Sequence, residues 1–150
     1  MTFRSILVAD DMLEVSEHAL QEAVDIAKVT RAKLTLISVV PVVSASYPIP
    51  VPMGDAFPSE IDRLNKRLEA QRVRLLTAGL SEVETALLQG DPVDRVVEYA
   101  QKHRPDLIVV GSRGLSAAGR FLLGSVSDGI LHHVHCSVLV VKPPAESPHA

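Results

Sequence analysis

Short, continuous apolar runs alternate along the chain with longer segments in which apolar residues recur every three or four positions. A continuous apolar run is typical of a strand buried on both faces, whereas the three-to-four spacing predicts an amphipathic helix. The predicted strands are Ile6–Ala9, Leu34–Val40, Val83–Leu88, Leu107–Val110 and Ser137–Val141. Because strands and helices alternate, the pattern predicts an α/β protein with a parallel sheet and helices on both faces.

Four predicted helices connect these strands. Their apolar stripes run from Val15 to Ala27, from Ile61 to Leu76, from Val93 to Ala100, and from Val126 through Ile130 and Leu131 to Val134. We predict that Ser16 caps the first helix and that Asp91, followed by Pro92, caps the third. Gly79 is predicted to end the second helix, whose charged residues alternate in sign and indicate a solvated face.

The 150 residues are expected to form a single domain. Residues 41–59 contain five prolines, and we interpret this stretch as a flexible surface excursion without regular structure. The prolines are Pro41, Pro48, Pro50, Pro52 and Pro58. Residues 143–150 are expected to be a polar tail outside the core.

Composition argues against several classes of protein. A net charge of −3 and 3% aromatic residues supply neither the positive surface nor the stacking platforms of a nucleic-acid-binding protein. No apolar run approaches the roughly 20 residues that cross a bilayer, and the first residues do not resemble a signal peptide. Cys136 is the single cysteine and cannot form an internal disulfide. We therefore expect a cytoplasmic protein that binds neither membranes nor nucleic acid.

Two polar clusters follow predicted strands. Asp10–Asp11 comes after the first strand, and Gly111–Gly114 comes after the fourth. Right-handed crossovers restrict a chain of this kind to a few doubly wound arrangements, in which ligands bind beyond the carboxyl ends of the strands. If the first and fourth strands are neighbours, one crevice holds both clusters, but the hydrophobic pattern leaves the strand order open.

The stretch from Asp106 to Ser127 joins the fourth strand to a glycine-rich loop and then to a helix start at Gly124–Ser125. Glycine allows the backbone to approach a ligand closely, and the N–H groups of a helix start bind anions such as phosphate. A flexible connection with ordinary turn glycines is the alternative. We favour the phosphate interpretation, because three glycines and at least two serines surround one strand end.

The spacing of these glycines resembles that of the nucleotide-binding branch of the universal stress protein family. The family motif is glycine, two residues, glycine, nine residues, then glycine and serine or threonine, and it is matched by Gly111, Gly114, Gly124 and Ser125. The segments ILVADD, Gly-Asp-Pro at 90–92, DLIVVGSRG and HCSVLVVKP also resemble the family. The resemblance covers residues 4–142 and implies a Rossmann-like, adenine nucleotide alpha hydrolase-like fold with a five-stranded parallel sheet in the order 3-2-1-4-5.

The same resemblance implies that the ligand is ATP with a phosphate-bound Mg²⁺ ion. It places Asp11 near the ribose and adenine, Ala9 and Val39 along the adenine, and two further groups of residues around the phosphates. These groups are Gly111, Ser112, Arg113, Gly114, Leu115 and Ser116 in the loop, and Gly124, Ser125, Val126 and Ser127 at the helix start. The chain departs from the family where Met12 and Leu13 replace the usual glycine and serine.

No carboxylate or histidine is placed convincingly as a base, so we assign no catalytic residue. We expect a nucleotide-dependent stress-response switch with slow or no ATP hydrolysis, at most a weak ATPase. One alternative is a non-catalytic interaction module with an empty pocket. A less favoured one is a phosphoacceptor receiver domain, which would use Asp10–Asp11 and Lys142 but would also need Asp91, a residue better used as an N-cap.

Two further features bear on metals and partners. The types of His132, His133, His135 and Cys136 suit zinc, but their spacing on a helix disfavours a shared ion, and we predict no protein-ligated metal site. The fifth strand, Ser137–Val141, is too apolar for a free sheet edge. The family resemblance implies homodimers that pair through this strand.

Overall fold

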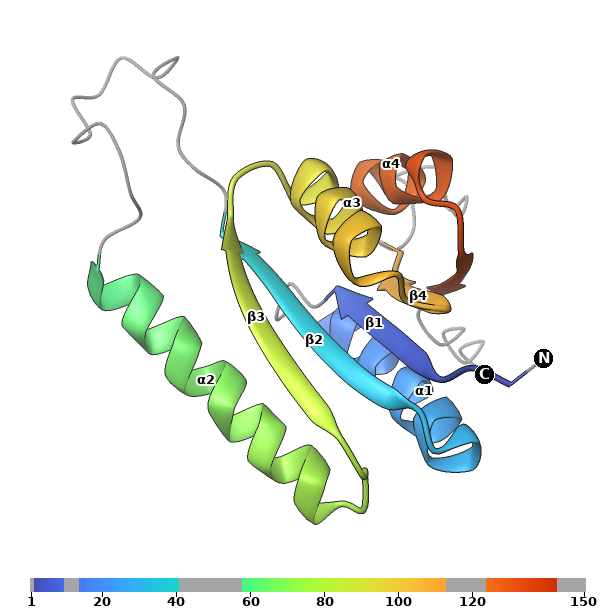
Figure 1. Ribbon diagram of the computed structural model, residues 1–150. Helices are drawn as coiled ribbons and strands as arrows, with labels where there is room; N and C mark the ends of the chain where they lie inside the picture. Colours follow the sequence, from blue (N-terminus) through green and yellow to red (C-terminus); the bar gives the residue numbers. More distant parts are fainter. Residues whose placement is uncertain (1, 10–13, 41–57, 113–123, 143–150) are drawn as a thin grey trace, which may run out of the picture.

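The computed structural model describes residues 2–9, 14–40, 58–112 and 124–142 (Figure 1). Five strands alternate with four helices, as the hydrophobic pattern predicts. The strands are β1 (Ser5–Ala9), β2 (Lys33–Val40), β3 (Val83–Gln89), β4 (Leu107–Gly111) and β5 (Ser137–Val141). The helices are α1 (Glu14–Thr30), α2 (Pro58–Thr77), α3 (Pro92–His103) and α4 (Ser125–His133). The predictions for 41–57 and for the tail lie outside the described residues.

The sheet has the order β3-β2-β1-β4-β5, and every neighbouring pair of strands is parallel. The doubly wound order expected from the family resemblance is therefore confirmed. β1 lies at the centre, where Val8 is opposite Leu36 on one side and Val109 on the other. Helices cover both faces of the sheet around β1, which explains why the central strands are apolar at almost every position.

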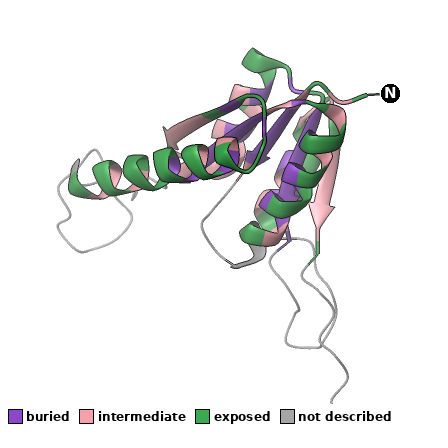
Figure 2. Ribbon diagram, turned by 90° about the horizontal axis from the view of Figure 1, so that it is seen from below, coloured by how far each residue is buried: buried purple, intermediate pink, exposed green. Residues whose placement is uncertain are grey.

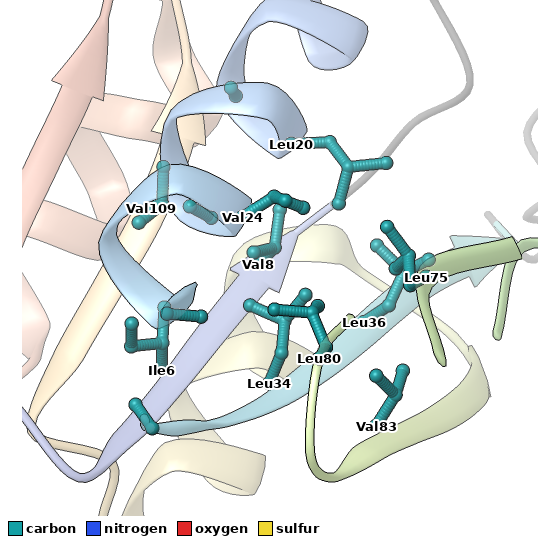
Figure 3. Close-up of a cluster of buried hydrophobic side chains, with 14 of the residues drawn as sticks. Ile6, Val8, Leu20, Val24, Leu34, Leu36, Leu75, Leu80, Val83 and Val109 are labelled. Atoms are coloured by element: carbon teal, nitrogen blue, oxygen red, sulfur yellow. The ribbon is translucent and has the colours of Figure 1, made fainter. Parts of the chain in front are cut away.

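One hydrophobic core lies between the sheet and the helices α1 and α2. Figure 3 shows Leu20 and Val24 of α1 lying over Val8 of β1, and Leu75 of α2 lying beside Leu36 of β2. Leu34 and Leu36 are 0% exposed. Burying a side chain of this size contributes roughly 1.5–3 kcal/mol, so this layer is a principal source of stability.

A second core lies on the opposite face, beneath α3 and α4, which pack side by side (Figure 1). Its buried members include Leu7 from β1, Ile108 from β4, Val96 from α3 and Ile130 from α4. Strand residues alternate between the two cores, because successive side chains of a strand point to opposite faces. The chain thus changes faces between α2 and α3.

Two helix ends follow their sequence signals. The Asp91 side chain accepts a 3.0 Å hydrogen bond from the Asp94 N–H, with Pro92 at the start of α3. After α2, Gly79 has φ 109°, and its N–H donates to the Leu76 carbonyl. The Leu80 N–H donates back to the Leu75 carbonyl, which completes a Schellman ending. Both predicted helix boundaries are confirmed.

Three predictions on the helices are wrong in detail. α1 begins at Glu14, so Ser16 lies inside the helix and does not cap it. α2 begins at Pro58, so residues 58 and 59 belong to a helix and not to the predicted irregular stretch; proline fits this first helical position, where its missing N–H costs no hydrogen bond. Leu131 is 45% exposed, since it follows the buried Ile130 and adjacent helical residues point about 100° apart.

The outer side of α2 is exposed along most of its length (Figure 2). Its charges form pairs along the helix, including Arg63 with Glu60 and Lys66 with Asp62. This arrangement agrees with the predicted solvated face. None of the helices in the described part of the chain has the length and apolar character needed to cross a bilayer.

Candidate functional site

The reversal of winding places a candidate site between β1 and β4. These strands are neighbours, with Ala9 opposite Val110. The chain after β1 leads to α1 on one face of the sheet, whereas the chain after β4 leads to α4 on the other face (Figure 1). Connections that diverge in this way leave a crevice beyond the carboxyl ends of the two strands, where ligands of open α/β sheets bind.

The carboxyl ends of β1 and β2 carry two of the predicted adenine-facing residues. Ala9 and Val39 are both partly buried, and both pack against the core beneath α3 and α4. Ala9 is opposite Ile37 on β2, two residues before Val39, so both side chains lie on the same face of the sheet. This apolar surface lies on the side of the sheet to which α4 is attached.

At the end of β4, Gly111 is the last strand residue and is opposite Val141 of β5. The Ser112 N–H donates a 3.0 Å hydrogen bond to the Val141 carbonyl, which holds the strand end against β5. The Ser112 side chain is 0% exposed, and its hydroxyl has no partner in the described part of the chain. Buried polar groups are normally hydrogen-bonded, so this hydroxyl is a group beside the candidate site that could bond a ligand.

The start of α4 is open. Gly124 is the N-cap with extended backbone angles, φ −64° and ψ 153°, and among the described residues no side-chain hydrogen bond caps the helix. The first intrahelical bond runs from the Asp128 N–H to the Gly124 carbonyl, at 2.9 Å. The N–H groups of Ser125, Val126 and Ser127 precede this bond and therefore have no intrahelical acceptor. Together with the helix dipole, they favour an anion at this position.

The start of α3 is different. The Asp91 carboxylate occupies the corresponding position and accepts the Asp94 N–H. A negative side chain that already bonds the first turn excludes a second anion there. The N-cap residue is described for two of the helices: Asp91 caps α3 with its side chain, whereas Gly124 has no side chain with which to cap α4.

Ser127 connects the start of α4 to the end of β4. Its hydroxyl donates a 2.7 Å hydrogen bond to the Gly111 carbonyl, 16 residues earlier in the chain. The Ser127 side chain is 3% exposed, so water competes little for this bond. The hydrogen bond therefore brings two predicted phosphate-site segments, the strand end and the helix start, into contact.

The structure thus brings together eight of the predicted site residues, and the others lie outside the described residues. Those brought together are Ala9, Val39, Gly111, Ser112, Gly124, Ser125, Val126 and Ser127. Those outside are Asp11, Arg113, Gly114, Leu115 and Ser116, as are Met12 and Leu13, where the chain departs from the family pattern.

The histidine and cysteine cluster lies at the opposite, amino-terminal edge of β4 and β5. His133, His135 and Cys136 line a hollow of about 390 Å³ there, together with the end of α3 and the residues that follow it. The Nδ1 atoms of His132 and His133 donate to the carbonyl oxygens of Asp128 and Gly129, both at 2.7 Å. Within the described residues, no three histidine, cysteine or acidic side chains are placed to share a metal ion.

Cys136 itself behaves as part of the core. It is partly buried and packs at the edge of the layer beneath α3 and α4. Burial raises the pKa of the Cys136 thiol above its ordinary value, and the nearby Asp106 carboxylate acts in the same direction. A thiol held in its neutral form is a poor nucleophile, which agrees with the predicted packing role.

Two contacts around the site were missed by reasoning from sequence. No local sequence pattern predicts the hydrogen bond from Ser127 to Gly111, because only the tertiary fold brings these residues together. The close approach of α4 to α3 does have a sequence signal, which is the glycine at position 129 inside a helix. A Cβ atom at Gly129 would lie 2.8 Å from a methyl group of Val93. An interior helical glycine often marks such a contact.

These features define a doubly wound α/β protein in which α4 begins, at an N-cap glycine, beside the topological switch point. The model of the Universal stress protein family matches residues 2–142. A universal stress protein of Methanocaldococcus jannaschii is 33% identical over 143 residues, which cover 95% of this chain and 84% of that protein. The chain belongs to the Universal stress protein family.

Solved structures agree with this assignment. Universal stress protein UspA from Lactobacillus plantarum superposes with a TM-score of 0.80 at 26% identity, covering 94% of this chain and 99% of that one. A universal stress protein solved in complex with cAMP superposes with a TM-score of 0.71 at 27% identity, covering 95% and 98%. The expected membership of the Universal stress protein family is thereby confirmed.

Proposed function

We propose that this protein binds ATP, with a phosphate-bound Mg²⁺ ion, in the crevice between β1 and β4, and that it acts as a nucleotide-dependent stress-response switch. In this proposal the adenine lies along Ala9 and Val39. The phosphates lie at the start of α4, with the residues of the glycine loop around them. Mg²⁺ is held chiefly by phosphate oxygens and water, as is usual for this ion, so the protein needs no cluster of carboxylates.

The observation that carries the proposal is the uncapped start of α4 beside the end of β4. Three N–H groups without an intrahelical acceptor lie there, at the end of a helix whose dipole attracts negative charge. A phosphate group suits this position, because it accepts several hydrogen bonds and carries negative charge. Gly124 has no side chain that would occupy the place of the phosphate. The relative solved with cAMP, which also carries an adenine and a phosphate, supports the same class of ligand.

The first test is chromatography of the nucleotide that the purified protein releases on denaturation, followed by calorimetric titration of emptied protein with Mg-ATP. Near-stoichiometric ATP supports both the site and slow turnover, whereas ADP supports binding with hydrolysis. A protein that arrives empty and takes up no Mg-ATP refutes the proposal. An interaction module with an empty pocket would then be the better description.

A second test uses the open cap itself. Gly124 has a negative φ, so its backbone accepts other residues without strain. In Gly124→Asp the new carboxylate caps the first turn and places a negative charge where the phosphate is expected. Two unit charges about 6 Å apart at an effective dielectric constant of about 20 repel by roughly 3 kcal/mol, so Mg-ATP affinity should fall about 100-fold.

Gly124→Ser is the matched control, because serine caps equally well but carries no charge. Both variants should unfold at the wild-type temperature or slightly above it, since both supply a missing cap. The charge effect is therefore the difference between them. Equal Mg-ATP affinity of Gly124→Asp and Gly124→Ser would show that no phosphate binds at this helix start.

We also propose that the protein forms homodimers through β5. This strand is the last of the sheet, and Val138, Leu139, Val140 and Val141 are only partly buried. An edge strand with four consecutive partly exposed apolar residues and free backbone groups is a template for pairing with a second strand. Antiparallel pairing of two copies across a two-fold axis covers it.

A further inference from the structure

Ser127 is a member of the predicted phosphate site, yet its side chain contacts the protein itself. The hydroxyl donates to the Gly111 carbonyl at 2.7 Å, and the side chain is 3% exposed. A serine hydroxyl has one proton to donate. With that proton committed to Gly111, the Ser127 side chain does not donate to a phosphate oxygen, whereas its backbone N–H remains in the open first turn of α4.

Each of the two segments that this bond joins is also held by a neighbouring element of the fold. On the strand side, the Ser112 N–H donates to the Val141 carbonyl at 3.0 Å. On the helix side, Ile130 is 0% exposed and Gly129 lies directly against Val93 of α3. The Ser127–Gly111 bond therefore connects two well-packed supports. It sets the distance between the end of β4 and the first turn of α4.

We propose that Ser127 is a positioning residue that holds the first turn of α4 in its anion-binding place before a ligand arrives. This inference rests on the proposed nucleotide site. Groups that are already held in the bound geometry lose less freedom when a ligand binds, so they bind it more tightly. Without the Ser127 hydroxyl, the start of α4 moves more freely relative to β4, and part of the binding free energy is used to fix it.

The first experiment examines the nucleotide-free protein by amide hydrogen exchange, with Ser127→Ala as the perturbation. The reporter is the Asp128 N–H, which donates to the Gly124 carbonyl in the first turn. A buried hydrogen bond contributes about 1 kcal/mol, so exchange at Asp128 should become about five- to tenfold faster. Ser125→Ala, which removes an exposed hydroxyl two residues earlier in the same helix, should leave exchange at Asp128 unchanged.

The second experiment compares two ligands, Mg-ATP and adenosine. Ser127→Ala should weaken Mg-ATP about five- to tenfold and adenosine by less than twofold, because only Mg-ATP places phosphates at the start of α4. Ser127→Thr keeps the hydroxyl and should restore both the exchange rate and the Mg-ATP affinity. A general loss of folded structure would weaken both ligands equally, so the ratio separates positioning from stability.

The possible failures can be told apart. If the wild type binds Mg-ATP and Ser127→Ala binds it equally well, the positioning role is refuted and the proposed function stands. Equal weakening of both ligands refutes it in the same way. If the wild type binds no Mg-ATP, the proposed function fails, and with it the positioning role. Unchanged exchange at Asp128 would refute the stabilising bond itself, whatever the nucleotide result.

Discussion

The contact between Gly129 and Val93 offers a sharp test of how α4 is held against the fold. An added Cβ at Gly129 would lie 2.8 and 2.9 Å from the two methyl carbons of Val93, whereas ordinary contacts begin near 3.4 Å. The obstacle is a short, stiff side chain on another helix. The valine has few alternative rotamers, so Gly129→Ala requires α3 and α4 to move apart.

Two opposing contributions set the size of the effect. Alanine is favoured over glycine inside a helix by about 1 kcal/mol. Forcing an extra methyl group into a packed contact costs about 1–3 kcal/mol. We therefore expect Gly129→Ala to destabilise the protein by about 1 kcal/mol, a shift of roughly 2–4 °C in the melting temperature for a chain of this size. Without the contact, the same substitution would stabilise.

Val93→Ala removes both methyl groups that the new Cβ would meet, so it should reverse the sign of the effect. In the Val93→Ala background, Gly129→Ala should raise the free energy of unfolding by up to about 1 kcal/mol. The coupling free energy from urea denaturation of the four proteins should be about 1–3 kcal/mol. A coupling below about 0.5 kcal/mol, or stabilisation by Gly129→Ala alone, would refute the packing argument.

Three further predictions follow from individual contacts. Asp91→Ala should lower the free energy of unfolding by about 1 kcal/mol, whereas Asp91→Asn should retain the cap; equal melting temperatures of the two variants would contradict this. Because the folded-state pKa of Cys136 is raised, its contribution to stability is complete below the ordinary pKa of 9.0 and is lost as pH rises past it. Urea unfolding between pH 8 and 11 should therefore show a smaller decline in Cys136→Ala than in the wild type, and identical declines would argue against it. Val140→Lys should shift the protein from dimer to monomer in light scattering, with Val140→Ala as the control for lost packing; an unchanged mass would count against pairing through β5.

The strands were the most predictable part of the fold. β1 and β4 are buried on both faces, so their sequences are almost purely apolar, and their bounds differ from the prediction by one residue each. The strand order was different, because a hydrophobic pattern records burial but not which strands are neighbours. That order came from the family resemblance, and the structure confirms it.

Helix boundaries were less predictable where competing signals were close together. Ser16 is a good N-cap by residue type, but α1 begins earlier at Glu14, so tertiary context overrode the local preference. Leu131 fits an apolar stripe by type, yet the packing of α4 buries Ile130 and leaves its neighbour exposed. Residue type predicts which faces are possible, and packing decides between them.

Within the candidate site, sequence could predict which residue types gather but not how they are bonded. The family resemblance implied that Gly111 and Ser127 would both lie at the phosphate site. It gave no reason to expect that the Ser127 hydroxyl would donate to the Gly111 carbonyl, because that contact depends on how α4 packs on α3. The difference matters, because the Ser127 hydroxyl then stabilises the position of the helix and does not donate a hydrogen bond to a phosphate oxygen.

The two helices that follow β3 and β4 show how the fold selects one binding position. Both begin at the carboxyl edge of the sheet, and both first turns offer N–H groups to an acceptor. β3 is at the edge of the sheet, away from the switch point, and there the Asp91 side chain caps α3. β4 adjoins β1, where the winding reverses, and there Gly124 supplies no side chain. Of these two helix starts, the one away from the switch point is capped by the chain itself, and the one beside the switch point has no side chain at its N-cap, so between the two an external anion is favoured at α4.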